Sequence, residues 1–247
     1  MPLALEVAVQ DAAGVRVARQ IGAARVELTH ALALGGVTPS PATLELALDA
    51  AGHDGPEVHV LVRPRAGGFH YDAEEIAATV RDVQWMLAHG ASGVVIGAQT
   101  ATGELDTQAL ERLRDAARTV REGAAVTLHR AIDVTPDPRA ALEIARELGL
   151  TRVLTSGGAS AALDGLDTLR ALVAAADGAI EVMAGSGVTA ENAASIAATG
   201  VDALHFSAKR VITADGGVRM GSADDGVGGH EVTDLDEARA VRAALGL

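Results

Sequence analysis

The chain has 247 residues, of which 49% are hydrophobic and 2% aromatic, and its formal net charge is −13. An acidic chain without a basic run is poorly suited to bind nucleic acid or an anionic membrane surface. The absence of cysteine excludes disulfides, thiolate metal sites and a cysteine nucleophile, and is typical of a cytoplasmic protein. We also expect no signal peptide and no membrane-spanning helix, since no apolar stretch reaches about 18 residues.

Short apolar runs alternate with segments of helical spacing along the chain. The runs that predict strands are Leu5–Val9, Arg25–Leu28, Val58–Val62, Gly93–Ile96, Ala125–Leu128, Arg152–Leu154, Glu181–Met183 and Ala203–Phe206. Helices are expected between them, for example over Ala73–His89, Asp106–Arg121 and Pro136–Leu148. Repeated βα units in a chain of this length predict a single α/β domain over residues 1–247, a (β/α)8 TIM barrel.

One segment departs from this alternation. Residues 215–229 are rich in Gly and Asp and lie between the last predicted strand and a final helix over Asp234–Ala244. A loop of this length either covers the barrel mouth or stays disordered. Its composition does not separate the two.

The segment around residues 180–207 carries the strongest functional signal. An apolar strand runs into Gly185-Ser186-Gly187, a helical segment follows, and the next strand ends in His205-Phe206-Ser207. Glycines let backbone N–H groups approach a ligand closely, and the loops after the last two strands of a barrel often bind phosphate. The alternative is that these glycines only form a tight turn.

Polar residues stand at the carboxyl ends of several other predicted strands, where a barrel has its active site. With the segment above, they form a candidate site of Glu6, Glu27, Arg63, Arg65, His129, Arg130, Asp133, Thr155, Ser156, Gly185, Ser186, Gly187, His205 and Ser207. We expect the catalytic groups to be Glu27, His129, Glu6 and Asp133, and the others to bind ligand.

Glu27 and His129 are the candidate acid and base, since an imidazole titrates near neutrality and a buried carboxylate is costly unless it is paired or used. The alternatives are that Glu27 and Glu6 belong to a structural ion-pair network with arginines, and that His129 is a hydrogen-bonded core histidine. Arg65 follows a proline and suits bidentate capture of an anion, unless it forms a salt bridge with Asp72.

A metal site is a further alternative. Glu6, Glu27 and His129 offer oxygen and nitrogen ligands, which suit a divalent ion such as zinc or manganese better than Cu(I). No HxH or HExxH spacing supports such a site, so whether a metal binds stays open.

The motifs together resemble the CutC family, whose members are described as copper homeostasis proteins. The matching segments are Leu5-Glu6-Val7, Ala24–Leu28, Gly35–Ser40, Arg63-Pro64-Arg65 with Gly67-Gly68-Phe69, His129–Asp133, Arg152–Gly157 and Met183–Val188. The resemblance implies a cytosolic TIM barrel, a homodimer or larger homo-oligomer, and a link to copper.

The chain departs from that family at the cysteines proposed to bind Cu(I). The corresponding positions hold Ala8 or Val9, and Thr29, and Met183 and Met220 alone are poor substitutes for thiolates. The retained polar groups instead predict a pocket for a small anionic or sugar-like ligand. Proton abstraction next to a carbonyl, in an isomerase or lyase, is one interpretation, and a non-enzymatic metal-binding protein is the other. A serine hydrolase is disfavoured because Ser156 and Ser186 lack a nucleophile-elbow pattern.

Overall fold

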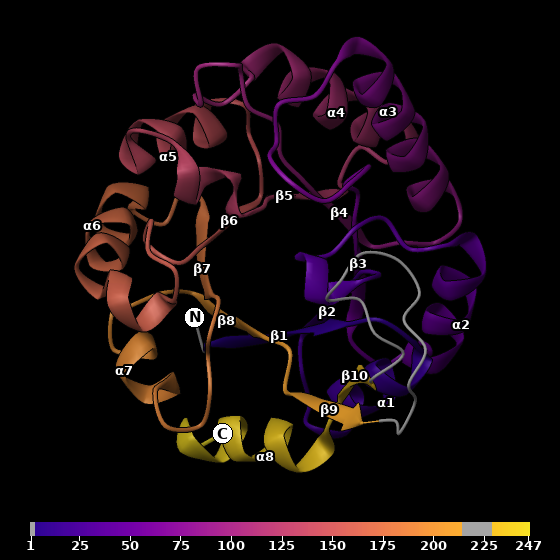
Figure 1. Cartoon of the computed structure of the whole chain (residues 1–247), viewed down its shortest axis with the longest axis vertical. Coiled ribbons are helices and arrows are strands. Elements are labelled where there is room, and N and C mark those ends of the chain that lie inside the picture. Colours follow the sequence, from indigo (N-terminus) through magenta and orange to yellow (C-terminus); the bar gives the residue numbers. More distant parts are fainter. Residues whose placement is uncertain (1–2, 214–228) are drawn as a thin grey trace.

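The computed structural model describes residues 3–213 and 229–247. Eight parallel strands close into a barrel in sequence order, and helices surround it (Figure 1). The strands are β1 Ala4–Val9, β2 Arg25–Leu28, β3 Glu57–Leu61, β4 Gly93–Ile96, β5 Ala125–Leu128, β6 Arg152–Thr155, β7 Glu181–Gly185 and β8 Ala203–Phe206. The α-helices are α1 Ala12–Gln20, α2 Pro41–Ala51, α3 Ala73–Ala88, α4 Thr107–Val120, α5 Pro138–Glu147, α6 Leu166–Ala176, α7 Ala193–Ala197 and α8 Leu235–Ala244. The predicted TIM barrel is therefore confirmed.

Aspartate and serine side chains set where most helices begin. Helices α1 to α5 and α8 start after residues whose side chains accept hydrogen bonds from backbone N–H groups of the first turn: Asp11, Ser40, Asp72, Asp106, Asp137 and Asp234. Such caps satisfy N–H groups that have no partner within the helix. Part of the acidic composition therefore serves to start helices.

The two faces of each strand differ in chemistry. In β1, Leu5, Val7 and Val9 belong to the main apolar core between strands and helices. Because side chains alternate along a strand, Glu6 and Ala8 face the barrel interior. The same parity places charged and polar side chains inside the barrel on other strands, so its interior is far more polar than the apolar sequence runs indicate.

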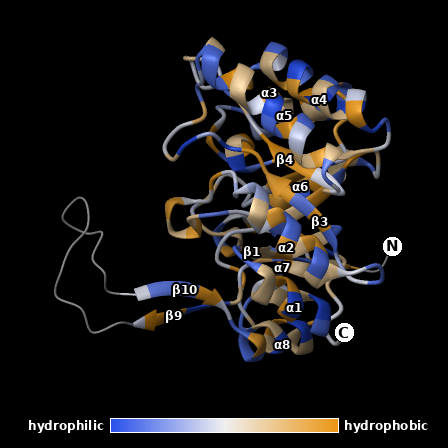
Figure 2. Cartoon of the chain, turned by 90° about the vertical axis from the view of Figure 1, so that its right-hand side faces the viewer, coloured by the Kyte–Doolittle hydropathy of each residue, from blue (hydrophilic) through white to orange (hydrophobic). Residues whose placement is uncertain are grey.

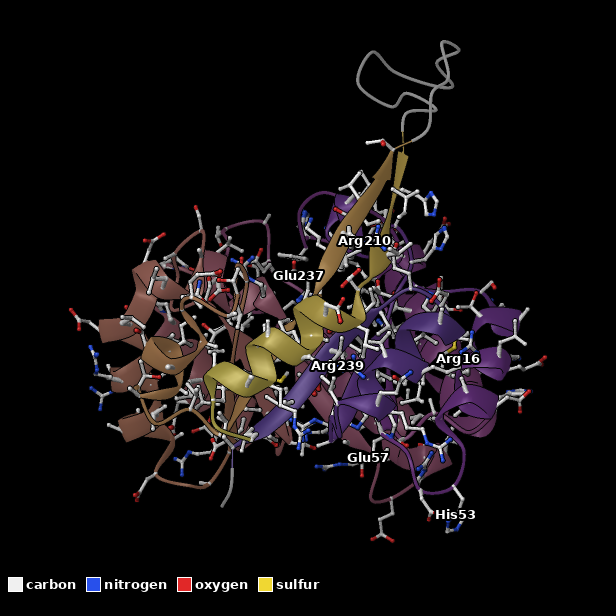
Figure 3. All side chains as sticks on the ribbon, turned by 90° about the horizontal axis from the view of Figure 1, so that it is seen from below. Arg16, His53, Glu57, Arg210, Glu237 and Arg239 are labelled. Carbon is white, nitrogen blue, oxygen red and sulfur yellow. The ribbon has the colours of Figure 1, made fainter. Side chains whose placement is uncertain are left out.

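A two-stranded antiparallel hairpin follows the barrel. Its strands are β9 Lys209–Thr213 and β10 Gly229–Thr233, and it projects from the body of the molecule (Figure 2). Figure 3 shows Arg210 near the base of the hairpin, where its Nε donates to Asp234 at 2.6 Å, just before α8. Neither strand was expected. The predicted Gly-rich loop lies outside the described residues except for Gly229.

Across residues 3–213 and 229–247, none of the helices has the length and apolar character needed to cross a bilayer.

Candidate functional site

A pocket of about 520 Å³ opens at the carboxyl ends of the barrel strands. Eight of the predicted site residues line it, namely Glu27, Arg63, His129, Arg130, Ser186, Gly187, His205 and Ser207. Apolar side chains, among them Leu32, Leu61, Phe69, Leu154 and Phe206, form much of the remaining wall. A mainly apolar pocket with a few converging polar groups is the usual form of a small-molecule site.

Below the pocket, a buried ionic network crosses the barrel interior. Arg25 bridges Glu6, at 3.0 Å, and Glu181, at 2.6 Å, while Arg152 pairs with Glu181 at 3.0 Å and contacts His59 at 3.2 Å. The two arginines and two glutamates balance in charge. This placement favours the interpretation that Glu6 belongs to a structural ion-pair network. Its arginine partner is Arg25, inside the barrel, and not an arginine at the mouth of the pocket.

Glu27 occupies a different environment. It is 5% exposed, lines the floor of the pocket, and forms no salt bridge with any described residue. Burial raises its pKa to about 7, with the negative charge of Glu6 adding to the effect and His205 opposing it. A carboxyl group that titrates near neutrality and faces a cavity is suited to accept a proton.

His205 lies next to both glutamates. Its Nδ1 is 2.9 Å from Glu6 Oε1, and the ligand atoms of Glu6, Glu27 and His205 all lie within 4.8 Å of one another. Burial opposes protonation of His205, but the carboxylates of Glu27 and Glu6 outweigh it and raise its pKa. The same contact helps Glu6, whose pKa falls to about 2 although burial alone would raise it. Glu6 therefore fixes the orientation of His205, and both glutamates favour its protonated form.

Gly185 makes room for this histidine. A Cβ at this position would lie 2.6 Å from Leu154 Cδ1 and 3.2 Å from both Cβ and Cδ2 of His205. The glycine before Ser186 thus permits the close packing of His205, although it does not itself line the pocket.

His129 differs from the expected acid–base group. Its Nδ1 accepts a hydrogen bond from the Ala131 N–H at 3.0 Å, so Nδ1 carries no proton. Burial, and then the charge of Arg63, lower its pKa to about 3. The ring is therefore neutral near pH 7 and carries its proton on Nε2, as a fixed hydrogen-bond donor.

The two arginines of the Arg63-Pro64-Arg65 motif lie in different places. Arg63 is 6% exposed and donates to the carbonyl oxygens of Leu34, Gly36 and Gly67, so it joins two loops at the edge of the pocket. Arg65 lies outside the pocket and pairs with Glu75 at 2.5 Å, not with Asp72. Arg65 was expected to bind the ligand, and its position outside the pocket does not support this expectation.

Asp133 organises the loop after β6 rather than facing the pocket. Its carboxylate accepts hydrogen bonds from Thr155 Oγ1, the Ser156 N–H and hydroxyl, and the Gly158 N–H, and it pairs with Arg130 at 2.8 Å. Arg130 also donates to Ser156 and Ser186. Thr155, Ser156 and Asp133 thus orient Arg130 and the Ser186 loop, which line the pocket.

Within residues 3–213 and 229–247, the side chains grouped closely enough to hold a metal ion are Glu6, Glu27 and His205, with His205 in the place where His129 was expected. Both oxygens of Glu6 already accept hydrogen bonds, from Arg25 and His205. Only Glu27 and His205 Nε2 remain free for an ion, which would need other ligands from water or substrate. Closed structural metal sites normally have four protein ligands.

Comparison with known proteins places the chain in a family. The family model described as CutC family matches residues 3–210. A CutC family protein of Caulobacter vibrioides is 48% identical over 204 residues, covering 82% of this chain and 80% of the relative. A CutC family protein of Agrobacterium fabrum is 39% identical over 246 residues, covering 99% of this chain and 95% of the relative.

Solved structures agree. The CutC structure from Streptococcus agalactiae, whose name assigns it provisionally to copper homeostasis, has a TM-score of 0.77 and 31% identity, covering 83% of this chain and 98% of that one. An aldolase with 18% identity, at a TM-score of 0.62, shares the fold alone. On the family match and the identity of these relatives, the chain belongs to the CutC family.

Proposed function

We propose that the barrel-mouth pocket binds a small anionic or sugar-like molecule with a carbonyl group, and transfers a proton at the carbon next to that carbonyl. Such a reaction belongs to an isomerase or a lyase. The observation that carries the proposal is Glu27, a buried carboxyl group without a salt bridge to a described residue, at the floor of a pocket and beside His205, whose pKa is raised by the two neighbouring carboxylates.

The chemical step uses Glu27 in its ionised form and His205 in its protonated form. Glu27 as carboxylate removes the proton, the electrons of the broken C–H bond form an enolate, and His205 donates a proton to product or intermediate. Both pKa values are raised on folding, which brings the Glu27 carboxyl group into the range where it can accept a proton near neutral pH and favours the protonated, donating form of His205. Glu6 acts as a positioning residue, since its carboxylate fixes Nδ1 of His205 and leaves Nε2 for the pocket.

Copper handling, which the family name suggests, has weaker support in these residues. The chain has no cysteine. Met183 is fully buried with its sulfur 3.9 Å from the Arg25 guanidinium, a neighbour that repels a cation, and Met86 packs in the apolar core. These groups do not fit Cu(I), which prefers thiolate and thioether ligands. A divalent ion on Glu27 and His205 is the second candidate.

The proposal includes a cytoplasmic homodimer. The absence of cysteine supports the location, and the resemblance to the CutC family supports the assembly.

Deuterium exchange tests the proposed reaction without a known substrate. Small 2-oxo acids, hydroxyaldehydes and hydroxyketones, each with and without phosphate, are incubated with the protein in D2O and followed by proton NMR. We expect loss of one C–H signal with at least one class, and a decrease of about 10²- to 10⁴-fold in Glu27→Gln. Arg65→Ala serves as the control and should exchange at the wild-type rate. Equal rates in Glu27→Gln and wild type, or no exchange with any class, would contradict the proposal.

A further inference from the structure

The pocket has a second polar wall, on the side of β3 to β5, that the acid–base pair does not use. His129 follows β5 and Arg63 follows β3, and both line the pocket. The Phe69 ring joins them, with its centroid 4.6 Å from that of the His129 ring and 5.1 Å from Arg63 Cζ. This wall carries positive potential and one fixed N–H donor.

The donor lacks an acceptor. His129 is 5% exposed, and its Nε2 is buried without a hydrogen-bond partner among the described residues. Since Nδ1 accepts from the Ala131 N–H, the ring cannot change tautomer to relieve this. A buried polar group without a partner costs about 1–3 kcal/mol, so an N–H donor of this kind at a pocket wall indicates a missing ligand atom.

The cation lacks a counter-charge. Four cationic groups line the pocket, and three have a carboxylate partner: Arg130 with Asp133, Lys209 with Glu231, and His205 with Glu6. Arg63 donates only to backbone carbonyl oxygens and forms no ion pair with a described residue. A buried guanidinium without a carboxylate is electrostatically incomplete.

Gly97 permits this arrangement. It follows β4, between the strands that carry Arg63 and His129. A Cβ at position 97 would lie 2.2 Å from His129 Cε1 and 2.7 Å from Nε2, so the imidazole occupies the space of the missing side chain. Alanine here would displace the donor without removing any polar group.

We propose that His129 Nε2–H and the charge of Arg63 form a subsite for a negatively charged oxygen of the ligand, either a carboxylate or an enolate oxygen. His129 is then a neutral donor rather than a base. The inference rests on the proposed function, because it concerns the same pocket. It limits the class of ligand to acids and to molecules that form an enolate.

Malonate and its neutral diamide, malonamide, are suitable probes for isothermal titration. We expect malonate to bind the wild-type protein, and malonamide to bind at least about tenfold more weakly, as for loss of a hydrogen bond to a charged group. His129→Leu and Gly97→Ala should each lower malonate affinity about tenfold or more, while His129→Gln, which keeps an N–H donor, should lose less. Arg65→Ala and Gly123→Ala, where a Cβ meets nothing within 4 Å, are the matched controls.

A measurement on the wild-type protein tests the subsite even if the variants do not fold. Nitrogen-15 NMR of the histidine side chains should show His129 neutral and protonated at Nε2 at pH 6, with its Nε2–H signal shifted by malonate. The inference is overturned by a protonated or Nδ1–H ring, by an unshifted signal at saturating malonate, by no malonate binding, or by unchanged affinity in His129→Leu. These outcomes are separate from deuterium exchange in Glu27→Gln, so either proposal can fail while the other stands.

Discussion

Replacing Glu27 by glutamine should stabilise the protein, and should do so more strongly as the pH rises. The folded protein holds the pKa of Glu27 at about 7, against 4.5 for the unconstrained group. With its pKa raised on folding, the carboxyl group binds its proton more tightly in the folded state. Its ionisation therefore costs stability as the pH rises from about 4.5 through 7.

The size of the effect follows from linkage. The difference between a pKa of about 7 and one of 4.5 corresponds to about 3.4 kcal/mol, at about 1.4 kcal/mol for each pH unit. About 2.5 kcal/mol of this falls between pH 5 and pH 8. Glutamine is nearly isosteric and does not titrate, so any packing cost it adds is the same at both pH values.

Urea unfolding of wild type and Glu27→Gln at pH 5 and pH 8 measures this difference directly. We expect the free energy of unfolding of the variant, relative to wild type, to increase by about 2.5 kcal/mol over this range. A difference that does not depend on pH would refute the reasoning, because it would mean that Glu27 keeps an ordinary pKa in the folded protein.

Three further predictions concern neighbouring groups. Glu6→Gln should cost about 3–5 kcal/mol of unfolding free energy near neutrality, because Arg25 keeps only Glu181 and His205 loses its carboxylate partner. Since the Glu6 pKa is lowered to about 2, this deficit should shrink on acidification below about pH 4.5, and a constant deficit in urea titrations would contradict it. Gly185→Ala should cost about 1–3 kcal/mol and reduce turnover through His205, whereas Gly123→Ala should do neither. Arg65→Ala should leave malonate affinity unchanged in calorimetry, and a clear loss would restore Arg65 as a ligand-binding residue.

The barrel could be predicted from the sequence because each strand is an apolar run and each connection carries helical spacing. The predicted and observed bounds of the elements agree closely. For example, α3 spans Ala73–Ala88, and the sequence predicted a helix over Ala73–His89. The β9–β10 hairpin was not predicted. Lys209–Thr213 begins only a few residues after the last barrel strand, so the sequence shows no separate apolar run there.

The roles within the site could be predicted only in part. The sequence indicated that Glu27, His129 and His205 lie at strand ends, but not which nitrogen of each imidazole is engaged. That depends on the Ala131 N–H for His129 and on Glu6, 199 residues away in sequence, for His205. Gly97 carries no signal in the sequence, because its importance lies in the contact with His129 across neighbouring strands.

The most direct test of the central claim is the titration of the Glu27 carboxyl group itself. Carbon-13 NMR of protein labelled at the glutamate side-chain carboxyl, with the signal assigned by its loss in Glu27→Gln, reports the pKa without a substrate. The account predicts a midpoint at about pH 7. A midpoint at or below 4.5, the value of the unconstrained group, would show a solvated or ion-paired carboxylate and would contradict the assignment of Glu27 as the base.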